Sequence, residues 1–225
     1  MPPRVSFVIP VLNESATIGD LLAVLRTRFP DAELIVIDGG SSDETVARAM
    51  PACDQLLVGE RGRAAQMNLG ARVANGDYLF FLHADSSPTV RDDDLHAYLA
   101  RDPDWGFCTL ELDAAGVAFR VIEWFINRRS RLTCVGTGDQ MLFMSRQCFE
   151  RCGGYDAIEL MEDVALCKRL RPEARPLLIA EPVITSARRW QQGGVLRTVL
   201  RMWGLRLAYA LGVPPRRLAR HYRHG

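Results

Sequence analysis

The sequence predicts an α/β protein with a mostly parallel central sheet, flanked by helices and followed by a C-terminal helical appendage. Two observations lead to this prediction. In the first half of the 225-residue chain, short apolar runs alternate with helical patterns, which is typical of βαβ units. These runs are apolar throughout, as expected of strands that helices cover on both faces.

The elements of the first half follow one another at short intervals. Strands are expected at residues 5–10, 33–38, 55–58 and 77–82, and helices at residues 17–29, 43–50 and 63–74. Ser42 is a suitable N-cap for the second helix, and Asn75-Gly76 ends the third. Strands and helices at this spacing predict a parallel sheet.

The second half is less regular. Strands are expected at residues 105–112 and 140–145, helices at 117–129 and 162–170, and two short edge strands at 176–180 and 183–186. We therefore predict one domain over residues 1–192 and a helical, Arg-rich appendage over residues 193–225. With 48% hydrophobic residues, the chain can form one well-packed domain with a short appendage.

Composition narrows the class of protein and its compartment. Lys and Arg number 28 against 27 Asp and Glu, so a globally basic nucleic-acid binder is not expected. The 6 cysteines form no CxxC pair, and the first residues lack the apolar segment of a signal peptide. Both observations predict the reducing cytoplasm. No apolar run predicts a transmembrane helix.

Polar residues follow three of the predicted strands. The segments are Pro10-Val-Leu-Asn13-Glu14, Asp38-Gly39-Gly-Ser-Ser-Asp43 and His83-Ala84-Asp85. In open parallel sheets, ligands bind beyond the carboxyl ends of the strands. The sequence therefore predicts a ligand site at this edge, built largely from acidic and other polar side chains.

The chain resembles the family 2 glycosyltransferases through segments 7–14, 36–43, 79–85 and 161–163, which fall in the family's order and spacing. The resemblance extends over about residues 4–190. Segment 61–70 and Arg188-Arg189-Trp190 resemble a small bacterial subgroup, some of whose members are named for association with radical-SAM proteins. The resemblance implies a GT-A (Rossmann-like) fold and an inverting, metal-dependent hexosyltransferase.

The resemblance also implies which residues bind the donor, a nucleoside-diphosphate sugar. Glu14 and Asp38 would hold the base and the ribose, because carboxylates accept hydrogen bonds from N–H groups and hydroxyls. Gly39 permits close backbone approach, and Pro10 and Asn13 complete this strand-end set. The alternative for Glu14 is a helix cap, and for Asp43 capping is at least as well supported as ligand binding.

His83-Ala84-Asp85 takes the place of the family's DxD motif. Asp85 would bind Mn²⁺ or Mg²⁺ through hard oxygen atoms. Ala84 joins the donor-binding set by its position, and His83 stands where the family often has Asp. His83 is expected either to contact the ligand or to be structural. Arg63, before a helix, either reaches the diphosphate or is a solvated surface residue.

Glu162-Asp163 is the candidate catalytic pair. Inverting transfer needs a general base for the acceptor hydroxyl, and the resemblance implies that Asp163 is this base and that Glu162 supports it. The alternative is two acids that stabilise the first turn of a helix. Asp139 is a candidate partner for sugar hydroxyls. Arg189 could pair with the diphosphate, and Trp190 could stack on an acceptor.

The Arg-rich appendage allows two interpretations that the sequence leaves open. It could be an interfacial membrane helix with a basic anchor at the inner face of the cell membrane, or a helix that packs on the domain or on a second copy in a homodimer. Arg197 and Arg201 share one helical face, whereas Arg206 falls nearly opposite. This geometry weakens the membrane interpretation.

Three other classes of function compete with glycosyl transfer. A non-catalytic nucleotide-sugar-binding protein is the main alternative. A nucleotidyltransferase is disfavoured by Pro10-Val-Leu-Asn-Glu14, where such enzymes carry a Gly-rich loop, and a Rossmann oxidoreductase is excluded because no GxGxxG follows Ile9. UDP is the expected nucleotide and GDP the next choice. A lipid phosphate, a small metabolite and a saccharide all remain open as acceptors.

Overall fold

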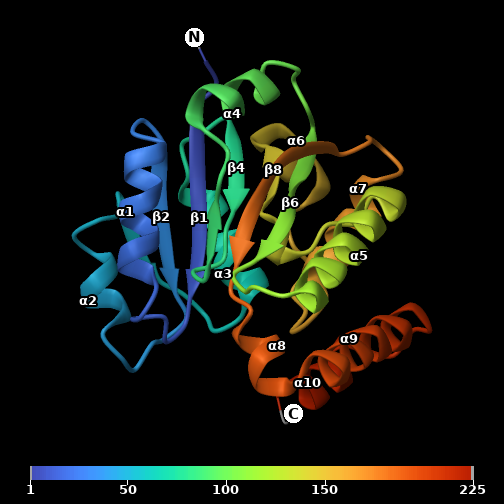
Figure 1. Ribbon diagram of the computed structural model, residues 1–225. Coiled ribbons are helices and arrows are strands. Elements are labelled where there is room, and N and C mark those ends of the chain that lie inside the picture. Colours follow the sequence, from blue (N-terminus) through green and yellow to red (C-terminus); the bar gives the residue numbers. More distant parts are fainter. Residues whose placement is uncertain (1, 224–225) are drawn as a thin grey trace.

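The computed structural model describes residues 2–223 and has an eight-stranded mixed sheet between helices (Figure 1). The strands are β1 (Val5–Val11), β2 (Glu33–Asp38), β3 (Gln55–Val58), β4 (Tyr78–Phe81), β5 (Ser86–Pro88), β6 (Trp105–Leu112), β7 (Leu142–Ser145) and β8 (Leu177–Thr185). Their order in the sheet is β3-β2-β1-β4-β7-β6-β8-β5. The first four strands are mutually parallel, and β7 runs antiparallel to both β4 and β6. The predicted mostly parallel α/β fold is confirmed.

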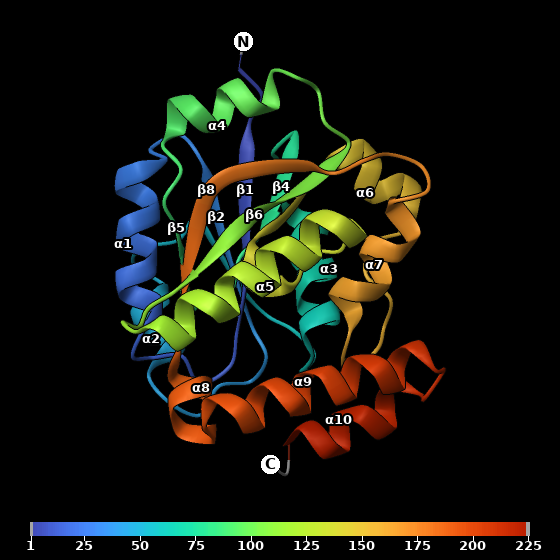
Figure 2. The ribbon, with the colours of Figure 1, turned by 45° about the vertical axis from the view of Figure 1, so that its right-hand side comes forward.

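The helices lie mainly on the two faces of this sheet (Figures 1 and 2). They are α1 (Ile18–Arg28), α2 (Thr45–Ala49), α3 (Arg63–Val73), α4 (Asp92–Leu99), α5 (Val117–Thr133), α6 (Arg146–Cys152), α7 (Glu162–Leu170), α8 (Arg188–Gly193), α9 (Val195–Ala210) and α10 (Pro215–Arg223). A 3₁₀ turn, η1 (Gly138–Gln140), precedes β7. Three short elements, α4, α6 and β5, were not expected from the sequence.

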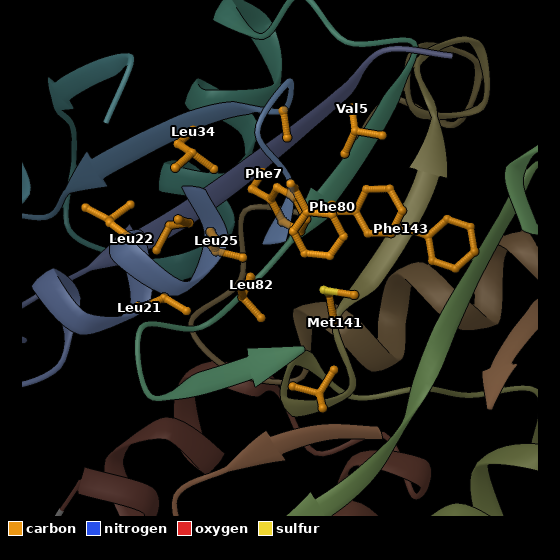
Figure 3. Packing of buried hydrophobic residues seen from close by; sticks show 14 of the residues in the cluster. Val5, Phe7, Leu21, Leu22, Leu25, Leu34, Phe80, Leu82, Met141 and Phe143 are labelled. Atoms are coloured by element: carbon orange, nitrogen blue, oxygen red, sulfur yellow. The ribbon is translucent and has the colours of Figure 1, made fainter. Parts of the chain in front are cut away.

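Each face of the sheet has its own hydrophobic core, because strand side chains alternate between the two faces. One core packs α1 and α4 against Phe7, Phe80 and Phe143 of adjacent strands. Their ring centroids are 5.4 Å apart for Phe7–Phe80 and 4.9 Å for Phe80–Phe143 (Figure 3). The opposite core packs α3, α6 and α7 against the sheet. Fully buried strands account for the uninterrupted apolar runs of the sequence.

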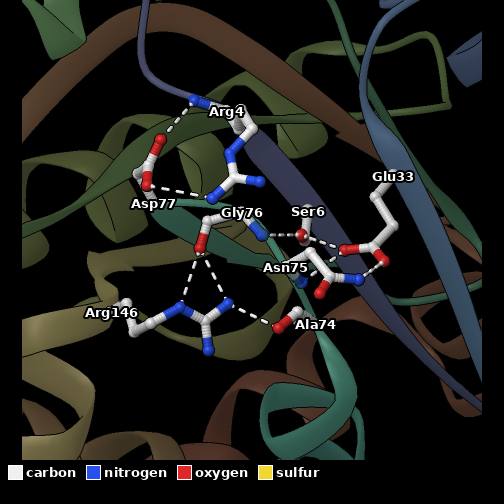
Figure 4. Close-up of polar contacts among 8 residues, drawn as sticks. All are labelled: Arg4, Ser6, Glu33, Ala74, Asn75, Gly76, Asp77 and Arg146. Atoms are coloured by element: carbon white, nitrogen blue, oxygen red, sulfur yellow. Dashed lines mark hydrogen bonds and ion pairs between the residues drawn. The ribbon is translucent and has the colours of Figure 1, made fainter.

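Polar side chains tie the amino ends of the strands together (Figure 4). The Glu33 carboxylate accepts hydrogen bonds from the Ser6 hydroxyl at 2.6 Å and from the Asn75 backbone N–H at 2.7 Å. Arg146 donates to the carbonyl oxygens of Ala74 and Gly76 at 2.6 and 2.7 Å. The amino edge is thereby closed by structural contacts, whereas the carboxyl edge faces α8, α9 and α10 (Figure 1).

The prediction of two short edge strands at residues 176–180 and 183–186 is wrong. The structure has one strand, β8, between β6 and β5. Pro182 lies inside it and cannot donate a ladder hydrogen bond. A register shift between Cys108 and Thr109 of β6 absorbs the irregularity, and the Pro182 carbonyl accepts from the Thr89 N–H at 3.0 Å. Pairing with β6 therefore continues past the proline.

The strand expected at residues 140–145 begins later, at Leu142. Gln140 belongs to η1, where it forms a capping box with Thr137. Its side-chain carbonyl accepts from the Ser130 hydroxyl at 2.8 Å, which links η1 to α5. This turn carries Asp139, so its position in the fold matters for the site described below.

The C-terminal helices pack against the body of the protein. Leu205 of α9 and Leu218 of α10 are buried in the core that contains α3 and α7. Leu200, Trp203, Leu207 and Leu211 of the same region are exposed. Within residues 2–223, every helix is too short or too polar to cross a bilayer.

Candidate active site

The loops after β1 and β2 are joined by side-chain hydrogen bonds. Asn13 has a φ of 56°, a left-handed conformation that Asn adopts more readily than most residues. Its N–H donates to the Ser41 hydroxyl at 2.9 Å, and its side-chain oxygen accepts from the Ser42 N–H at 2.8 Å. Asn13 therefore fixes the relative position of two loops that the sequence assigns to the donor.

Asp38 is a buried loop-forming residue in this structure, with 2% of its surface exposed. One carboxylate oxygen accepts the N–H groups of Gly40 and Ser41, both at 2.9 Å, and the other accepts the Ser41 hydroxyl. Beside it, the Gln66 amide donates to the carbonyls of Val11 and Ile37 at 2.9 and 2.7 Å. The predicted contact of Asp38 with the nucleotide stays a prediction.

Asp43 forms a turn before α2. Its carboxylate accepts the Thr45 N–H at 3.0 Å and the Ser15 N–H at 3.2 Å. The hydrogen bond from the Thr45 side chain, followed by those involving Ser15, lowers its pKa to about 2. These contacts form a turn ahead of α2, whose N-cap is Glu44 without a side-chain cap hydrogen bond. The N-cap expected at Ser42 is therefore wrong, and the ligand role of Asp43 stays a prediction.

A chain of contacts connects the end of β4 with η1 and α7. His83 is 8% exposed, and its Nδ1 lies 3.1 Å from a carboxylate oxygen of Asp139. The residue before Asp139, Gly138, donates its N–H to Asp163 at 2.8 Å. Residues 83, 138–139 and 163, far apart in the sequence, are thus held together by direct contacts.

The candidate pair Glu162-Asp163 opens α7, directly after Met161 with a φ of 69°. The two Asp163 oxygens accept from the N–H groups of Gly138 and Val164 at 2.8 and 2.7 Å. A carboxylate has about four acceptor positions, so Asp163 retains capacity to accept a proton. Glu162 is 6% exposed, and burial, followed by the negative charge of Asp163, raises its pKa.

Two cavities bring the candidate residues together. A cavity of about 550 Å³ is lined by Glu14, Asp85, Asp139 and Arg188 together with apolar side chains. A small recess of about 60 Å³ is lined by Arg63, His83, Asp139, Glu162 and Asp163. Asp139, Thr137, Met202 and Arg206 line both. The recess with the acid pair therefore adjoins the large cavity.

Glu14 and Asp85 face the large cavity from the ends of β1 and β4. Burial raises the pKa of Glu14, and the negative charge of Asp85 raises it further, against lowering contributions from Thr17, Arg188 and Arg63. The two carboxylates are therefore close enough to repel. Such a pair is stabilised by a cation between or beside its members.

Some predicted donor-binding residues do not line either of these cavities: Pro10, Asn13, Asp38, Gly39 and Ala84. They belong to β1, β2 or the loops that support the lining residues. Arg189 lies in α8, but its side chain is outside the described residues.

Sequence reasoning missed Arg129 of α5 and Arg206 of α9, both of which line the large cavity. Each carried a signal. Ile122, Ile126 and Arg129 follow the spacing of one helical face, so Arg129 interrupts an apolar stripe. Arg206 lies opposite the neighbouring arginines of α9, on the side that the fold turns inward.

Gly138→Ala is expected to disturb this site through sterics alone. A Cβ atom at position 138 would lie 2.5 Å from Cε1 and Nε2 of His83, so the enclosed ring would have to move away from Asp139. We expect a loss of about 1–3 kcal/mol in the free energy of unfolding, measured by denaturant unfolding.

Gly19→Ala in α1 is the matched control, because nothing lies within 4 Å of a Cβ atom there. Gly19 is the second residue of α1, so we expect the change to alter the free energy of unfolding by less than about 1 kcal/mol. Equal stability of Gly138→Ala and the wild type would contradict the described packing of His83 against the turn.

The sheet order, the two flanking layers and the acidic carboxyl edge define the class of fold, the GT-A fold of glycosyltransferases. The structure of Staphylococcus aureus TarS 1–349 in complex with UDP matches with a TM-score of 0.64 and 15% identity, over 81% of this chain and 60% of that chain. The mannosyltransferase PcManGT from Pyrobaculum calidifontis, in complex with GDP-Man and Mn²⁺, matches with a TM-score of 0.62 and 23% identity, over 83% and 57% of the two chains.

The family signal lies in the first half of the chain, where residues 6–109 match the model of glycosyl transferase family 2. A poly-beta-1,6-N-acetyl-D-glucosamine synthase of Staphylococcus epidermidis is 36% identical over 105 residues, 44% of this chain and 25% of that protein. A PGL/p-HBAD biosynthesis glycosyltransferase of Mycobacterium bovis is 38% identical over 93 residues, 38% of this chain and 36% of that protein.

The chain thus carries a glycosyltransferase family 2 segment, which spans only a quarter to about a third of these two relatives. The predicted resemblance to this family is confirmed for the segment. The association with radical-SAM proteins has no counterpart in these matches and stays a prediction.

Proposed function

We propose that the protein transfers a glycosyl group from a nucleoside-diphosphate sugar to an acceptor hydroxyl, with inversion at the anomeric carbon. The observation that carries this proposal is the adjacency of two acidic groups at one edge of a GT-A sheet. Asp85 and Glu14 line the large cavity, and Asp163 lines the recess that opens beside it. Asp85 and Glu14 suit the binding of a diphosphate with its cation, and Asp163 suits the binding of an acceptor hydroxyl.

The described residues fit a cation that arrives with the donor. No three His, Cys, Asp or Glu side chains within the described ranges form a ready-made metal site. Mg²⁺ in nucleotide enzymes, however, is bound through one or two carboxylates together with phosphates and water. Asp85, with Glu14 beside it, would hold Mn²⁺ or Mg²⁺, which neutralises charge on the departing diphosphate.

In the proposed step, Asp163 takes the proton of the acceptor hydroxyl as the oxygen attacks the anomeric carbon. The bond from that carbon to the acceptor oxygen forms while the bond to the diphosphate oxygen breaks, and the nucleoside diphosphate leaves. The Gly138 N–H and the start of α7 hold Asp163 in place. Glu162, buried beside it, orients the pair.

UDP is the proposed nucleotide, supported by the likeness to a chain in complex with UDP, with GDP as the next choice because a second similar structure holds GDP-Man. The test is release of nucleoside diphosphate from a panel of UDP- and GDP-sugars, with Mn²⁺, Mg²⁺ or EDTA, and with water as the acceptor. We expect metal-dependent release from one donor. If none of the panel binds in a thermal-shift assay with either metal, the proposal is wrong.

A further inference from the structure

The large cavity has an apolar wall that a nucleotide sugar does not need. α5 contributes Phe125 and Ile126, and α9 contributes Val199, Met202 and Trp203. In Figure 2, α5 crosses in front of the sheet and α9 lies below it, and residues of both helices line this cavity. Phe125 and Trp203 are 51% and 61% exposed, so the apolar lining continues from the cavity to the surface. Such a lining buries an apolar portion of a ligand.

Two arginines stand in this otherwise apolar wall. Arg129 donates to the Ser130 hydroxyl at 3.0 Å through one terminal nitrogen, but its Nε is buried and has no hydrogen-bond partner among the described residues. Arg206, on the facing helix, lines the same cavity. A buried donor without an acceptor is costly, and a ligand oxygen would satisfy it.

The two arginines also place like charges near each other in this wall. Burial, followed by the like charge of Arg206, lowers the pKa of Arg129 to about 10, and burial lowers the pKa of Arg206. The negative charges of Asp163 and Asp139 act in the opposite direction on both arginines. Both guanidinium groups remain charged at neutral pH, and a ligand anion would relieve their repulsion.

The position of Arg206 connects this wall with the chemistry. Arg206 and Met202 line both the large cavity and the recess that holds Asp163. A molecule whose anionic group lies on Arg206 therefore places its neighbouring atoms beside the proposed base. The proposed donor side of the cavity, by contrast, is lined by the carboxylates of Glu14 and Asp85 and the guanidinium of Arg188.

We propose, as an extension of the glycosyl transfer proposed above, that the acceptor is an amphipathic anion. Arg129 and Arg206 bind its phosphate or carboxylate group, and the apolar side chains of α5 and α9 bind its hydrocarbon portion. The acceptor's reacting oxygen then lies at Asp163, and the donor occupies the side of the cavity that carries Glu14 and Asp85.

Decyl phosphate is a suitable probe, used below the concentration at which it forms micelles, with inorganic phosphate and decanol as separate arms. Trp190 and Trp203 line the cavity, so tryptophan fluorescence reports binding. We expect decyl phosphate to bind at least tenfold more tightly than either fragment probe. Arg129→Gln and Arg206→Gln should each weaken it by roughly tenfold to a hundredfold, since each removes charged hydrogen bonds, and should leave decanol binding unchanged.

Arg131→Gln in α5 and Arg197→Gln in α9 are the matched controls, because these exposed arginines share the helices but do not line the cavity. Both should bind decyl phosphate like the wild type. Should Arg206→Gln fail to fold, Arg206→Lys keeps the charge without the planar fork and should bind with intermediate affinity. Equal binding by the wild type and the two Gln variants overturns the inference, as does equal affinity for phosphate and decyl phosphate.

Titration with UDP in the presence of Mn²⁺ separates the acceptor from the donor. We expect UDP affinity to be the same in Arg206→Gln and the wild type. A loss of UDP affinity that parallels the loss for decyl phosphate would assign the arginines to the donor and overturn the inference. If Arg-dependent binding of decyl phosphate persists while no donor in the panel is used, the glycosyl-transfer proposal fails and the ligand class of the cavity stands.

Discussion

Asp163→Asn is expected to lower the rate of glycosyl transfer by roughly 10²- to 10⁴-fold while donor affinity stays within about twofold of wild type. The amide cannot take the proton of the acceptor hydroxyl. Its single carbonyl oxygen can still accept one of the two N–H groups, from Gly138 or Val164, that the carboxylate accepts. The rate is measured as release of nucleoside diphosphate from one nucleotide-sugar donor. The affinity of each variant for the same donor is measured in a binding titration.

Glu159→Gln is the matched control, because this exposed acid lies just before α7 and lines neither cavity. It should behave like the wild type. Glu162→Gln should cost less activity than Asp163→Asn, since Glu162 is buried and acts on its neighbour. If Glu162→Gln proves the more severe, the role of base moves to Glu162; if neither variant loses activity, the proposed mechanism is wrong.

Asp85→Asn should raise the concentration of Mn²⁺ or Mg²⁺ needed for half-maximal activity by at least roughly tenfold. Even the loss of a residue that only hydrogen-bonds to a metal ligand typically lowers metal affinity or activity by about 10- to 100-fold. Higher metal concentration should restore part of the activity. Loss of the Asp85 charge also removes one cause of the raised pKa of Glu14. Glu14 remains as a second carboxylate for the cation.

The experiment is a titration of wild type and Asp85→Asn with each metal after treatment with EDTA. Asp94→Asn is the control, since Asp94 is an exposed acid in the first turn of α4 and lines neither cavity. Activity of the wild type that survives EDTA, or an unchanged metal response in Asp85→Asn, would argue against a cation held by Asp85.

Local patterns in the sequence were sufficient for the parallel half of the sheet. The predicted bounds of the strands at 33–38 and 55–58 match β2 and β3. Buried strands and amphipathic helices carry their period within a few residues, and the βαβ connection then brings the strand ends to one edge. The sequence is for this reason sufficient to assign Glu14 and Asp85 to one site.

The antiparallel half and the detailed roles of side chains depended on tertiary contacts. His83 meets Asp139, which lies 56 residues further along the chain, and Asp38 satisfies its carboxylate within its own turn. β8 continues through Pro182 because β6 shifts register beside it. No short motif encodes such pairings, since each depends on where distant elements pack.

The sequence by itself determined the parallel strands of the first half, the acidic character of their carboxyl edge and the resemblance to family 2 glycosyltransferases, because these features reside in short segments with their own periodicity and spacing. The tertiary structure decided which polar groups face the cavity and which support it. It also placed Arg129 and Arg206 in the wall of the same cavity, because helix packing determines which faces of α5 and α9 are covered.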